Sequence, residues 1–244
     1  MLTSMTSRIR LFVDQPLGPA QSVELTREQA HYLFSVMRQP VGASISLFNS
    51  VDGEWVAEII DAGKRKGRLL CSRMTKPLQM PPDLWFLFAP IKKSRTDFIV
   101  EKAAEMGAAR IIPVQTEFTN SERVRRDRLQ AHAIEATEQC GGTYVPEVNE
   151  MHSLDHFLGT WPNGRHLLFC DEQRVGQPIA LTDFPKGAWA ILIGPEGGFS
   201  QAERQKLNQY NFTHSIALGP RILRADTAAV AALTIWQQHL GDWS

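Results

Sequence analysis

The chain has 244 residues, of which 43% are hydrophobic and 21% charged, with 26 basic and 26 acidic side chains. This length and composition are typical of a soluble globular protein of two domains, and they exclude a membrane-spanning or low-complexity chain. The first ten residues lack the apolar core of a secretion signal, and the three cysteines are widely spaced. We therefore expect a cytoplasmic protein without membrane attachment, disulfide framework or metal site.

The amino-terminal region, residues 8–76, predicts short β-strands interrupted by one helix. The helix is expected around Arg27–Met37, with Thr26 as its cap. Polar and apolar residues alternate over 44–50, and after Val-Asp-Gly a second strand-like run follows at 54–61. Two such runs joined by a turn signal are typical of a β-hairpin. Together these elements indicate a small β-barrel.

Cations are concentrated in this region although the chain as a whole is neutral. Six Lys and Arg residues and no acidic residue lie between Lys64 and Lys76. Local clusters of this kind make phosphate contacts in nucleic-acid-binding proteins. A solvated turn is the alternative explanation for the same run.

A proline-bearing break at 77–82 separates the barrel from a second domain, which we expect at 83–244. In this domain apolar strands alternate with amphipathic helices, an order that predicts a largely parallel sheet. The expected strands are 84–91, 110–114, 166–171, 190–193 and 215–218. The expected helices begin after Ser94, at Arg125, at Gln201 and at Thr227.

Two of these strands end in glycine-containing loops. The run Ala190–Ile193 leads into Gly-Pro-Glu-Gly-Gly-Phe-Ser, and Ser200 with Glu203 forms a capping box for the next helix. The run 215–218 leads into Gly-Pro-Arg-Ile-Leu-Arg, and Asp226 is placed to cap the last helix. Because open α/β sheets bind ligands at the carboxyl ends of their strands, the two loops are candidates for one binding site.

The first loop differs from phosphate-binding loops. The Walker pattern requires Gly-Lys-Ser/Thr where this chain has Gly198-Phe199, Glu196 adds a negative charge, and Gly-x-Gly-x-x-Gly is absent. A neutral or cationic ligand therefore fits better than a triphosphate. A single loop of this kind is most simply a tight turn. Two such loops at neighbouring strand ends favour a binding site, and the second of them carries Arg221 and Arg224.

These segments resemble the RsmE family of SPOUT-class methyltransferases, which methylate N3 of one uridine in 16S ribosomal RNA with S-adenosylmethionine. The matching segments follow the order of the family: 31–38, 92–107, 135–140, 193–200 and 218–228. Asp226, Met106 and the pair Gly141-Gly142 depart from the family's usual Glu, Leu and Arg at these places.

The resemblance implies an α/β fold with two parts. A SPOUT-type parallel-sheet methyltransferase domain with a deep trefoil knot would span 83–244, and a small PUA-like β-barrel that binds RNA would span 1–76. Ordinary rules of chain topology would exclude the knot, so the resemblance alone carries it. The implied cofactor is S-adenosylmethionine, and the implied partner is 16S rRNA, free or within the small ribosomal subunit.

The resemblance also implies a set of site residues. Three loops would form the cofactor pocket, with Cys170, Glu172, Gly194, Pro195, Glu196, Gly197, Gly198, Leu218, Gly219, Ile222, Leu223 and Arg224. Contacts to RNA are expected from cations of the amino-terminal region, on the evidence of their clustering, and from residues of the matching segments: Arg10, Arg38, Lys64, Arg65 and Lys66 among the former, and His31, Lys92, Lys93, Lys102 and Glu138 among the latter.

Methylation at N3 requires that uracil lose the proton on this nitrogen. Alignment of two bound reactants lowers a barrier by about 7–11 kcal/mol, whereas a general base contributes roughly 10²–10⁴-fold, so we expect positioning to dominate. Arg224 is the first candidate for stabilising the uracil anion, with a phosphate or dimer contact as its alternative role. Glu138 is a weaker candidate for a base, and His31 is expected to pack or to face RNA.

The last helix, 227–240, is apolar over much of its surface, with Ala229, Leu233, Trp236 and Leu240 on one stripe. The sheet covers one side of such a helix. A second subunit in a homodimer is the simplest cover for the other, and the amino-terminal domain is the alternative.

Two other classes of function stay open on the sequence. One is a SPOUT enzyme that methylates ribose 2′-hydroxyls of RNA. The other is an RNA-binding assembly factor without catalysis.

Overall fold

The structure is a computed structural model that describes residues 9–120, 124–177 and 184–243. The chain divides into two compact units. Unit 1 runs to Met80 and includes Thr137–Val145, whereas unit 2 comprises Pro81–Ala136 and Pro146–Ser244. The segment Thr137–Val145 therefore packs with unit 1, although it was predicted to belong to the second domain.

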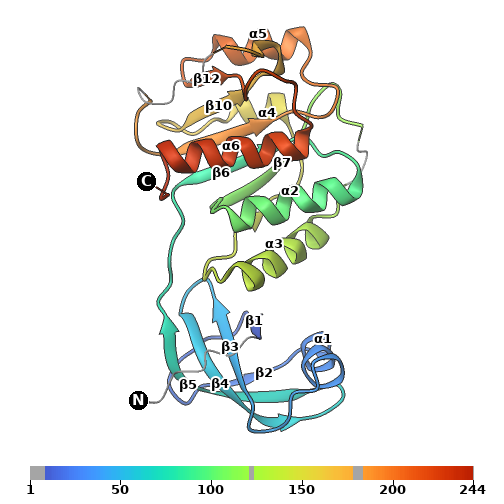
Figure 1. Ribbon diagram of the computed structural model, residues 1–244, viewed down its shortest axis with the longest axis vertical. Helices are drawn as coiled ribbons and strands as arrows, with labels where there is room; N and C mark the ends of the chain where they lie inside the picture. Colours follow the sequence, from blue (N-terminus) through green and yellow to red (C-terminus); the bar gives the residue numbers. More distant parts are fainter. Residues whose placement is uncertain (1–8, 121–123, 178–183, 244) are drawn as a thin grey trace. The chain divides into compact units, whose positions relative to one another are not determined.

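Unit 1 is built on a curled five-stranded sheet (Figure 1). Its strands are β1 (Arg10–Phe12), β2 (Ser22–Glu24), β3 (Ser44–Asn49), β4 (Gly53–Ala62) and β5 (Gly67–Lys76), in the order β1-β3-β4-β5-β2. The predicted hairpin is confirmed, because β3 and β4 pair antiparallel in continuous register. The core of the sheet holds apolar side chains that are fully buried, among them Val23, Leu33, Ile45, Leu47, Ile59 and Leu69.

The predicted helix of unit 1 and its cap are confirmed. Helix α1 (Arg27–Ala30) begins at a capping box in which Thr26 accepts a hydrogen bond from the Gln29 amide. The helix continues as a π-helix over His31–Val36, which the sequence did not predict. There the Met37 amide donates to the Tyr32 carbonyl five residues back, at 2.9 Å, where an α-helix would use a carbonyl four back.

Unit 2 holds an all-parallel sheet, as predicted, in the order β12-β10-β11-β6-β7-β8, with β9 paired to β7. The strands are β6 (Leu84–Phe88), β7 (Arg110–Gln115), β8 (Glu147–Val148), β9 (His152–Ser153), β10 (His166–Cys170), β11 (Trp189–Ile193) and β12 (Thr213–Ile216). The helices are α2 (Lys93–Glu105), α3 (Arg126–Cys140), α4 (Leu154–Gly159), α5 (Gln201–Gln209) and α6 (Ala225–His239), with a 3-10 turn at Glu172–Arg174. The end of α3, from Thr137, belongs to unit 1.

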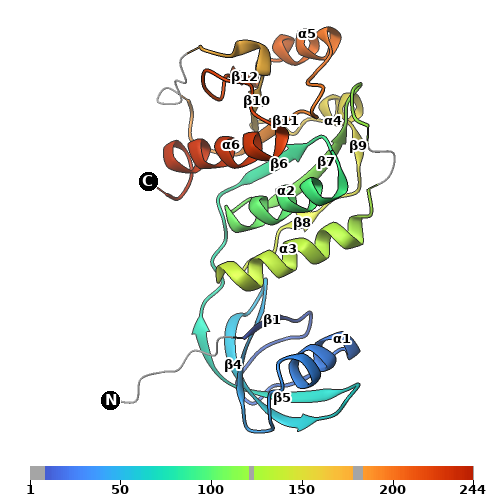
Figure 2. The ribbon, with the colours of Figure 1, turned by 45° about the vertical axis from the view of Figure 1, so that its right-hand side comes forward.

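Helices cover both faces of this sheet, which is why its strands read as continuous apolar runs. Figures 1 and 2 show α2 and α6 side by side on one face. Side chains of α4 and α5, including Leu154, Leu158 and Leu207, pack with the strands' other face. The short elements β8, β9 and α4 were not predicted, because each is too brief to show a period in the sequence.

Several local predictions differ from the structure, among them the end of β6, which was expected at residue 91 and lies at Phe88. Ser94 lies inside α2, whose N-cap is Lys92 and has no side-chain hydrogen bond. The last helix starts earlier than expected, because the Arg224 carbonyl already accepts from the Ala228 amide at 2.7 Å, and Asp226 lies in the first turn. Strand β12 ends at Ile216, two residues before the expected end. The capping box of Ser200 and Glu203 on α5 is confirmed.

Helix α6 buries the predicted stripe inside unit 2 except for Leu240, which is the C-cap residue and is half-buried. Ala229, Leu233 and Trp236 are completely buried, and Gln237 beside them donates from Nε2 to the Met106 carbonyl at 2.6 Å. Ile235, on another side of the helix, is only half-buried. No helix in the described part of the chain is long and apolar enough to cross a membrane.

Candidate functional site

A cavity of about 300 Å³ lies in unit 2, where the chain leaves strands β10, β11 and β12. Three loops converge on it: the one after β10, the glycine loop between β11 and α5, and the segment that leads into α6. Most of the predicted cofactor residues line it, namely Cys170, Glu172, Gly194, Pro195, Glu196, Gly198, Leu218, Ile222, Leu223 and Arg224. Gly197 and Gly219, also predicted, belong to the same loops but are not among the lining residues.

Asp171 and Arg221, which lie inside the predicted loops, also line the cavity, and four further lining residues were not predicted: Val175, Ile193, Ala225 and Ala228. Ile193 and Ala225 directly flank the predicted loops, so the loops needed only a slightly wider boundary. Val175 and Ala228 carry no local signal of a ligand, because only the folding of the chain brings them to the cavity.

Two glycines shape the cavity because a side chain at either position would meet the rest of the site. An added Cβ on Gly194 would lie 2.6 Å from the ring of Phe199, which is itself buried. Gly198 has φ +70°, a conformation that favours glycine, and an added Cβ there would overlap the Glu172 carboxylate. The backbone of this loop therefore forms a cradle without side chains at these points.

Arg204 of α5 holds the loop after β10 in place. Its Nε donates to Asp171 Oδ1 at 3.0 Å, and its terminal nitrogen pairs with Glu172. Glu172 in turn accepts from the Phe199 amide at 3.3 Å. The two carboxylates at the cavity are thus oriented before any ligand arrives.

Arg95 of α2 connects the other two loops. Its guanidinium pairs with Glu196 of the glycine loop, and its Nε lies 3.6 Å from Asp226 Oδ2 in the first turn of α6. The role expected for Asp226 as a cap is therefore corrected. Its carboxylate accepts a hydrogen bond from the Thr227 amide at 2.8 Å and faces Arg95.

The remaining chemistry of the cavity is cationic and apolar. Arg221 and Arg224 are exposed, and neither forms an ion pair within the described part of the chain. Burial raises the pKa of the Cys170 thiol, which is therefore neutral and suited to lining the cavity rather than to nucleophilic attack. Among the described residues, no group of three His, Cys, Asp or Glu side chains is placed to hold a metal ion.

Part of the cationic run in unit 1 lines a separate cavity. Lys64 and Arg65, from the turn between β4 and β5, and His31, from the π-helix, contribute to it; its complete lining is Arg27, Glu28, His31, Ser35, Lys64 and Arg65. Lys66 and Arg38 are exposed on the same unit. The structure thus brings together several residues that were expected to contact RNA.

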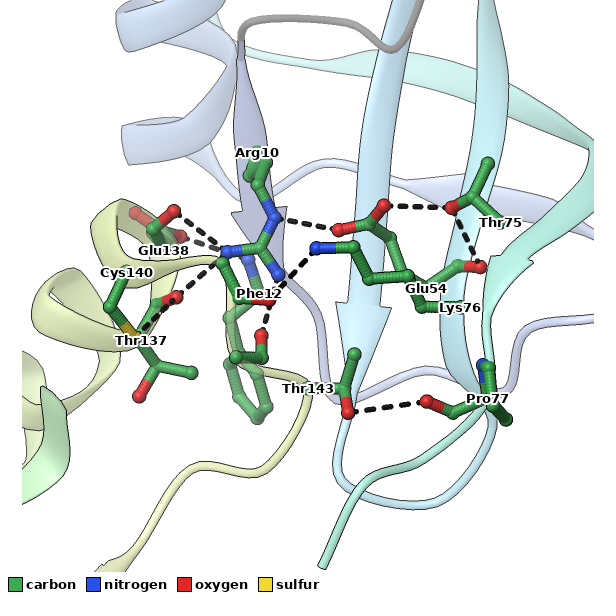
Figure 3. Close-up of polar contacts among 12 residues, drawn as sticks. Arg10, Phe12, Glu54, Thr75, Lys76, Pro77, Thr137, Glu138, Cys140 and Thr143 are labelled. Carbon is green, nitrogen blue, oxygen red and sulfur yellow. Dashed lines mark hydrogen bonds and ion pairs between the residues drawn. The ribbon is translucent and has the colours of Figure 1, made fainter. Parts of the chain in front are cut away.

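Arg10 was also expected to contact RNA, and the structure corrects this. Its side chain is only 12% exposed, and Nε donates to Glu54 at 2.6 Å. Its other nitrogens donate to the carbonyls of Thr137, Glu138 and Gly142 (Figure 3). With these partners Arg10 caps the carboxyl end of α3, and its charge is balanced by Glu54 inside unit 1.

Three other expected contacts also have structural roles. The Glu138 carboxylate accepts from the Phe12 amide at 2.9 Å, which fixes β1. Lys102 pairs with Glu105 at 2.6 Å, and Lys92 is the N-cap residue of α2. Lys93, by contrast, lines a cavity next to α2.

Two family models match the chain in succession. The RNA methyltransferase PUA domain matches residues 25–69, and the RNA methyltransferase domain matches residues 79–237. The first lies in unit 1 and the second begins at its end, which agrees with the expected order of a barrel followed by a methyltransferase domain.

Relatives of the same kind align over nearly the whole chain. The ribosomal RNA small subunit methyltransferase E of Rickettsia conorii is 31% identical, with 92% of this chain and 93% of the relative covered. The Bacillus subtilis protein of the same name is 27% identical, and the match covers 92% of this chain and 94% of the relative.

Solved structures show the same fold. A ribosomal RNA small subunit methyltransferase E from Neisseria gonorrhoeae, crystallised with S-adenosyl methionine, superposes with a TM-score of 0.87 at 27% identity and covers 97% of this chain and 99% of that one. A Legionella pneumophila structure with the same cofactor bound superposes with a TM-score of 0.85 at 29% identity, and the match covers 96% of this chain and 98% of that one. With both domain models matched in order and relatives aligned from end to end, the chain belongs to the ribosomal RNA small subunit methyltransferase E family of RNA methyltransferases.

Proposed function

We propose that this protein transfers a methyl group from S-adenosylmethionine to N3 of one uridine in 16S rRNA. The observation that carries the proposal is the cavity at the ends of β10, β11 and β12, formed by glycine loops with no lysine in its lining. Because the substrate is ribosomal RNA, we also propose that the protein works in the cytoplasm.

The residues of the cavity fit S-adenosylmethionine. The cofactor has a sulfonium cation, a carboxylate and an adenosine, but no phosphate. The volume of about 300 Å³ lies at the lower end of ligand pockets, and Gly194 and Gly198 leave backbone open to a ligand. Leu218, Ile222 and Leu223 would pack on adenine.

When bound, the cofactor supplies an electrophilic methyl group. The acceptor is N3 of uracil, whose proton would be lost to solvent. Arg224 would stabilise the negative charge that develops on the uracil ring, since its guanidinium lines the cavity without an ion-pair partner in the described residues. Arg204 and Arg95 would act by holding the loops of the cavity in place.

Arg224→Ala is expected to lower kcat by about 10²–10³-fold, the usual effect of removing one donor that stabilises an anion in a transition state. The N-cap geometry survives the change, because it uses only the Arg224 carbonyl. Arg224→Lys should restore part of the rate, since lysine keeps the charge without the planar fork. Single-turnover methylation of unmodified rRNA measures the rate, and full activity of the alanine variant would end the assignment.

We propose that the cations of unit 1 contact RNA phosphates. Replacing Lys64, Arg65 and Lys66 together by alanine should flatten the salt dependence of RNA affinity by roughly 0.7–0.9 in log–log slope for each phosphate that these side chains neutralise. Lys186→Ala, which removes an exposed cation of unit 2, serves as the control. Fluorescence anisotropy over a range of salt concentrations gives the slopes, and an unchanged slope would identify the run as a solvated turn.

We propose further that the protein is a homodimer paired through α6, whose Ile235 side remains only half-buried in one chain. Light scattering at micromolar concentration should then give twice the chain mass of 27.4 kDa. A monomer at this concentration would contradict the proposal.

The experiment that tests the function is transfer of a labelled methyl group to 16S rRNA that lacks the modification. Mapping the label to N3 of a single uridine supports the proposal. Label on a ribose 2′-oxygen would favour the alternative SPOUT reaction, and RNA binding without any label would favour an assembly factor.

A further inference from the structure

A second cavity of unit 2, of about 290 Å³, shares no residue with the glycine-loop cavity. It lies between the first turns of α2 and α3. The residues that line it are Ile91, Lys93, Thr96, Val124, Arg125, Arg128 and Leu129. Three of them are cations and none is acidic, so the cavity has the charge of a site for an anion.

Arg128 is the fixed cation of this group. Its two terminal nitrogens donate to the two carboxylate oxygens of Asp97, one of them at 2.9 Å, and the side chain is 24% exposed. His132 Nε2 also lies 3.6 Å from Asp97. Since each terminal nitrogen carries two hydrogens, the bidentate pair leaves one N–H on each nitrogen for a second acceptor. Arg128 therefore offers oriented donors, with most of its charge balanced by Asp97.

Lys93 and Arg125 supply the charge that is not balanced. Both are exposed, and neither takes part in an ion pair among the residues that the structure describes. Lys93 is the first residue of α2, whose N-cap has no side-chain hydrogen bond, so the positive end of this helix adds to the field. Asp97 and Glu101 of α2 are occupied by Arg128 and His132, and Asp127 in the first turn of α3 pairs with Arg126.

The apolar lining and Thr96 give the cavity its shape. The Thr96 hydroxyl accepts from the Ile91 amide and donates to the Ile91 carbonyl, both at 3.0 Å, which ties the loop before α2 to the helix. Thr96 and Leu129 are buried, so the floor is rigid while the cations stand at the rim.

We propose that this cavity binds a phosphodiester group of the RNA substrate, with charge from Lys93 and Arg125 and a directed hydrogen bond from Arg128. The proposal rests on the proposed function only in taking RNA as the partner. S-adenosylmethionine has no phosphate, and its proposed pocket uses other residues. A backbone contact of this kind positions an RNA without reading its sequence.

The test compares the double variant Lys93→Ala/Arg125→Ala with the wild-type protein in binding a 16S rRNA fragment without cofactor. Removing two cations that neutralise phosphates should flatten the log–log salt slope by roughly 1.4–1.8 and weaken binding at low salt by about tenfold or more. The affinity for S-adenosylmethionine, measured by calorimetry, should stay unchanged and reports that unit 2 is folded. The control Lys186→Ala/Lys206→Ala removes two other cations of unit 2 and should keep the wild-type slope.

A slope that the double variant shares with the wild type would overturn the proposal. Because the measurement needs no methyl transfer, an enzyme that binds RNA with the expected slopes but methylates another atom would contradict the proposed function and leave this inference standing. Titration with inorganic phosphate alone separates the sources of the anion. Saturation of the cavity by free phosphate, with no effect of the double variant on RNA affinity, would make it a site for a small anion and refute the RNA contact.

Discussion

Gly198→Val is expected to abolish measurable binding of S-adenosylmethionine, a weakening of at least about 100-fold in Kd or about 2.7 kcal/mol. The Cβ of the new residue would overlap the Glu172 carboxylate, which lines the cavity and is held by Arg204. In addition, φ at this position is +70°, where a β-branched residue is strained. Loop and carboxylate cannot both keep their places, so the cradle for the cofactor is destroyed. Isothermal titration calorimetry measures the effect.

Gly164→Val is the matched control for backbone strain. Gly164 has φ +78° in unit 2, but an added Cβ there meets no atom within 4 Å, and the residue does not line the cavity. Both variants should lose a similar amount of stability from the left-handed conformation, on the order of 1–2 kcal/mol. Only Gly198→Val should lose the cofactor. Wild-type affinity in a folded Gly198→Val protein would remove the glycine loop from the site.

Arg10→Ala is expected to lower the free energy of unfolding of unit 1 by about 3–5 kcal/mol, the usual cost of removing one partner from a buried ion pair. The Glu54 side chain is only 2% exposed and would lose its cation (Figure 3). The carbonyls of Thr137, Glu138 and Gly142 would lose their donor as well. Differential scanning calorimetry of the whole chain should show the transition of unit 1 at a lower temperature.

Arg73→Ala is the matched control, since Arg73 is an exposed arginine on β5 of the same unit. Its effect should remain within about 0.5 kcal/mol, as for most surface substitutions. An Arg10→Ala protein as stable as this control would show that Arg10 does not hold the end of α3.

The same network predicts how acid affects unit 1. Burial raises the pKa of Glu54, but hydrogen bonds from Thr75 and Arg10 and the charges of Arg10 and Lys76 outweigh it, so the pKa lies below its ordinary value of 4.5. The stability that Glu54 contributes is therefore fully present above pH 4.5 and is lost as the pH falls through the lower, folded-state pKa. The difference between wild type and Arg10→Ala should accordingly shrink in strong acid.

Local signals in the sequence predicted the elements that depend on neighbouring residues. The cap at Thr26 and the capping box at Ser200 are present, because both signals involve only residues three positions apart. The parallel sheet followed from the alternation of strands and helices. The start of α6 was wrong by two residues, because Arg224 takes the N-cap position by backbone geometry alone and Asp226 pairs with Arg95 instead.

The sequence by itself determined the two-part order of the chain, most of its longer strands and helices, and the loops that contain most of the cavity's residues. Only the tertiary structure decided what the charged side chains do, because charge acts through space and its partners are far apart in the sequence. The sequence around Arg10 predicts a free cation, whereas in the structure Glu54 and the carbonyls at the end of α3 enclose this side chain. Lys93 and Arg125 lie 32 positions apart and become neighbours only where α2 and α3 meet around one cavity.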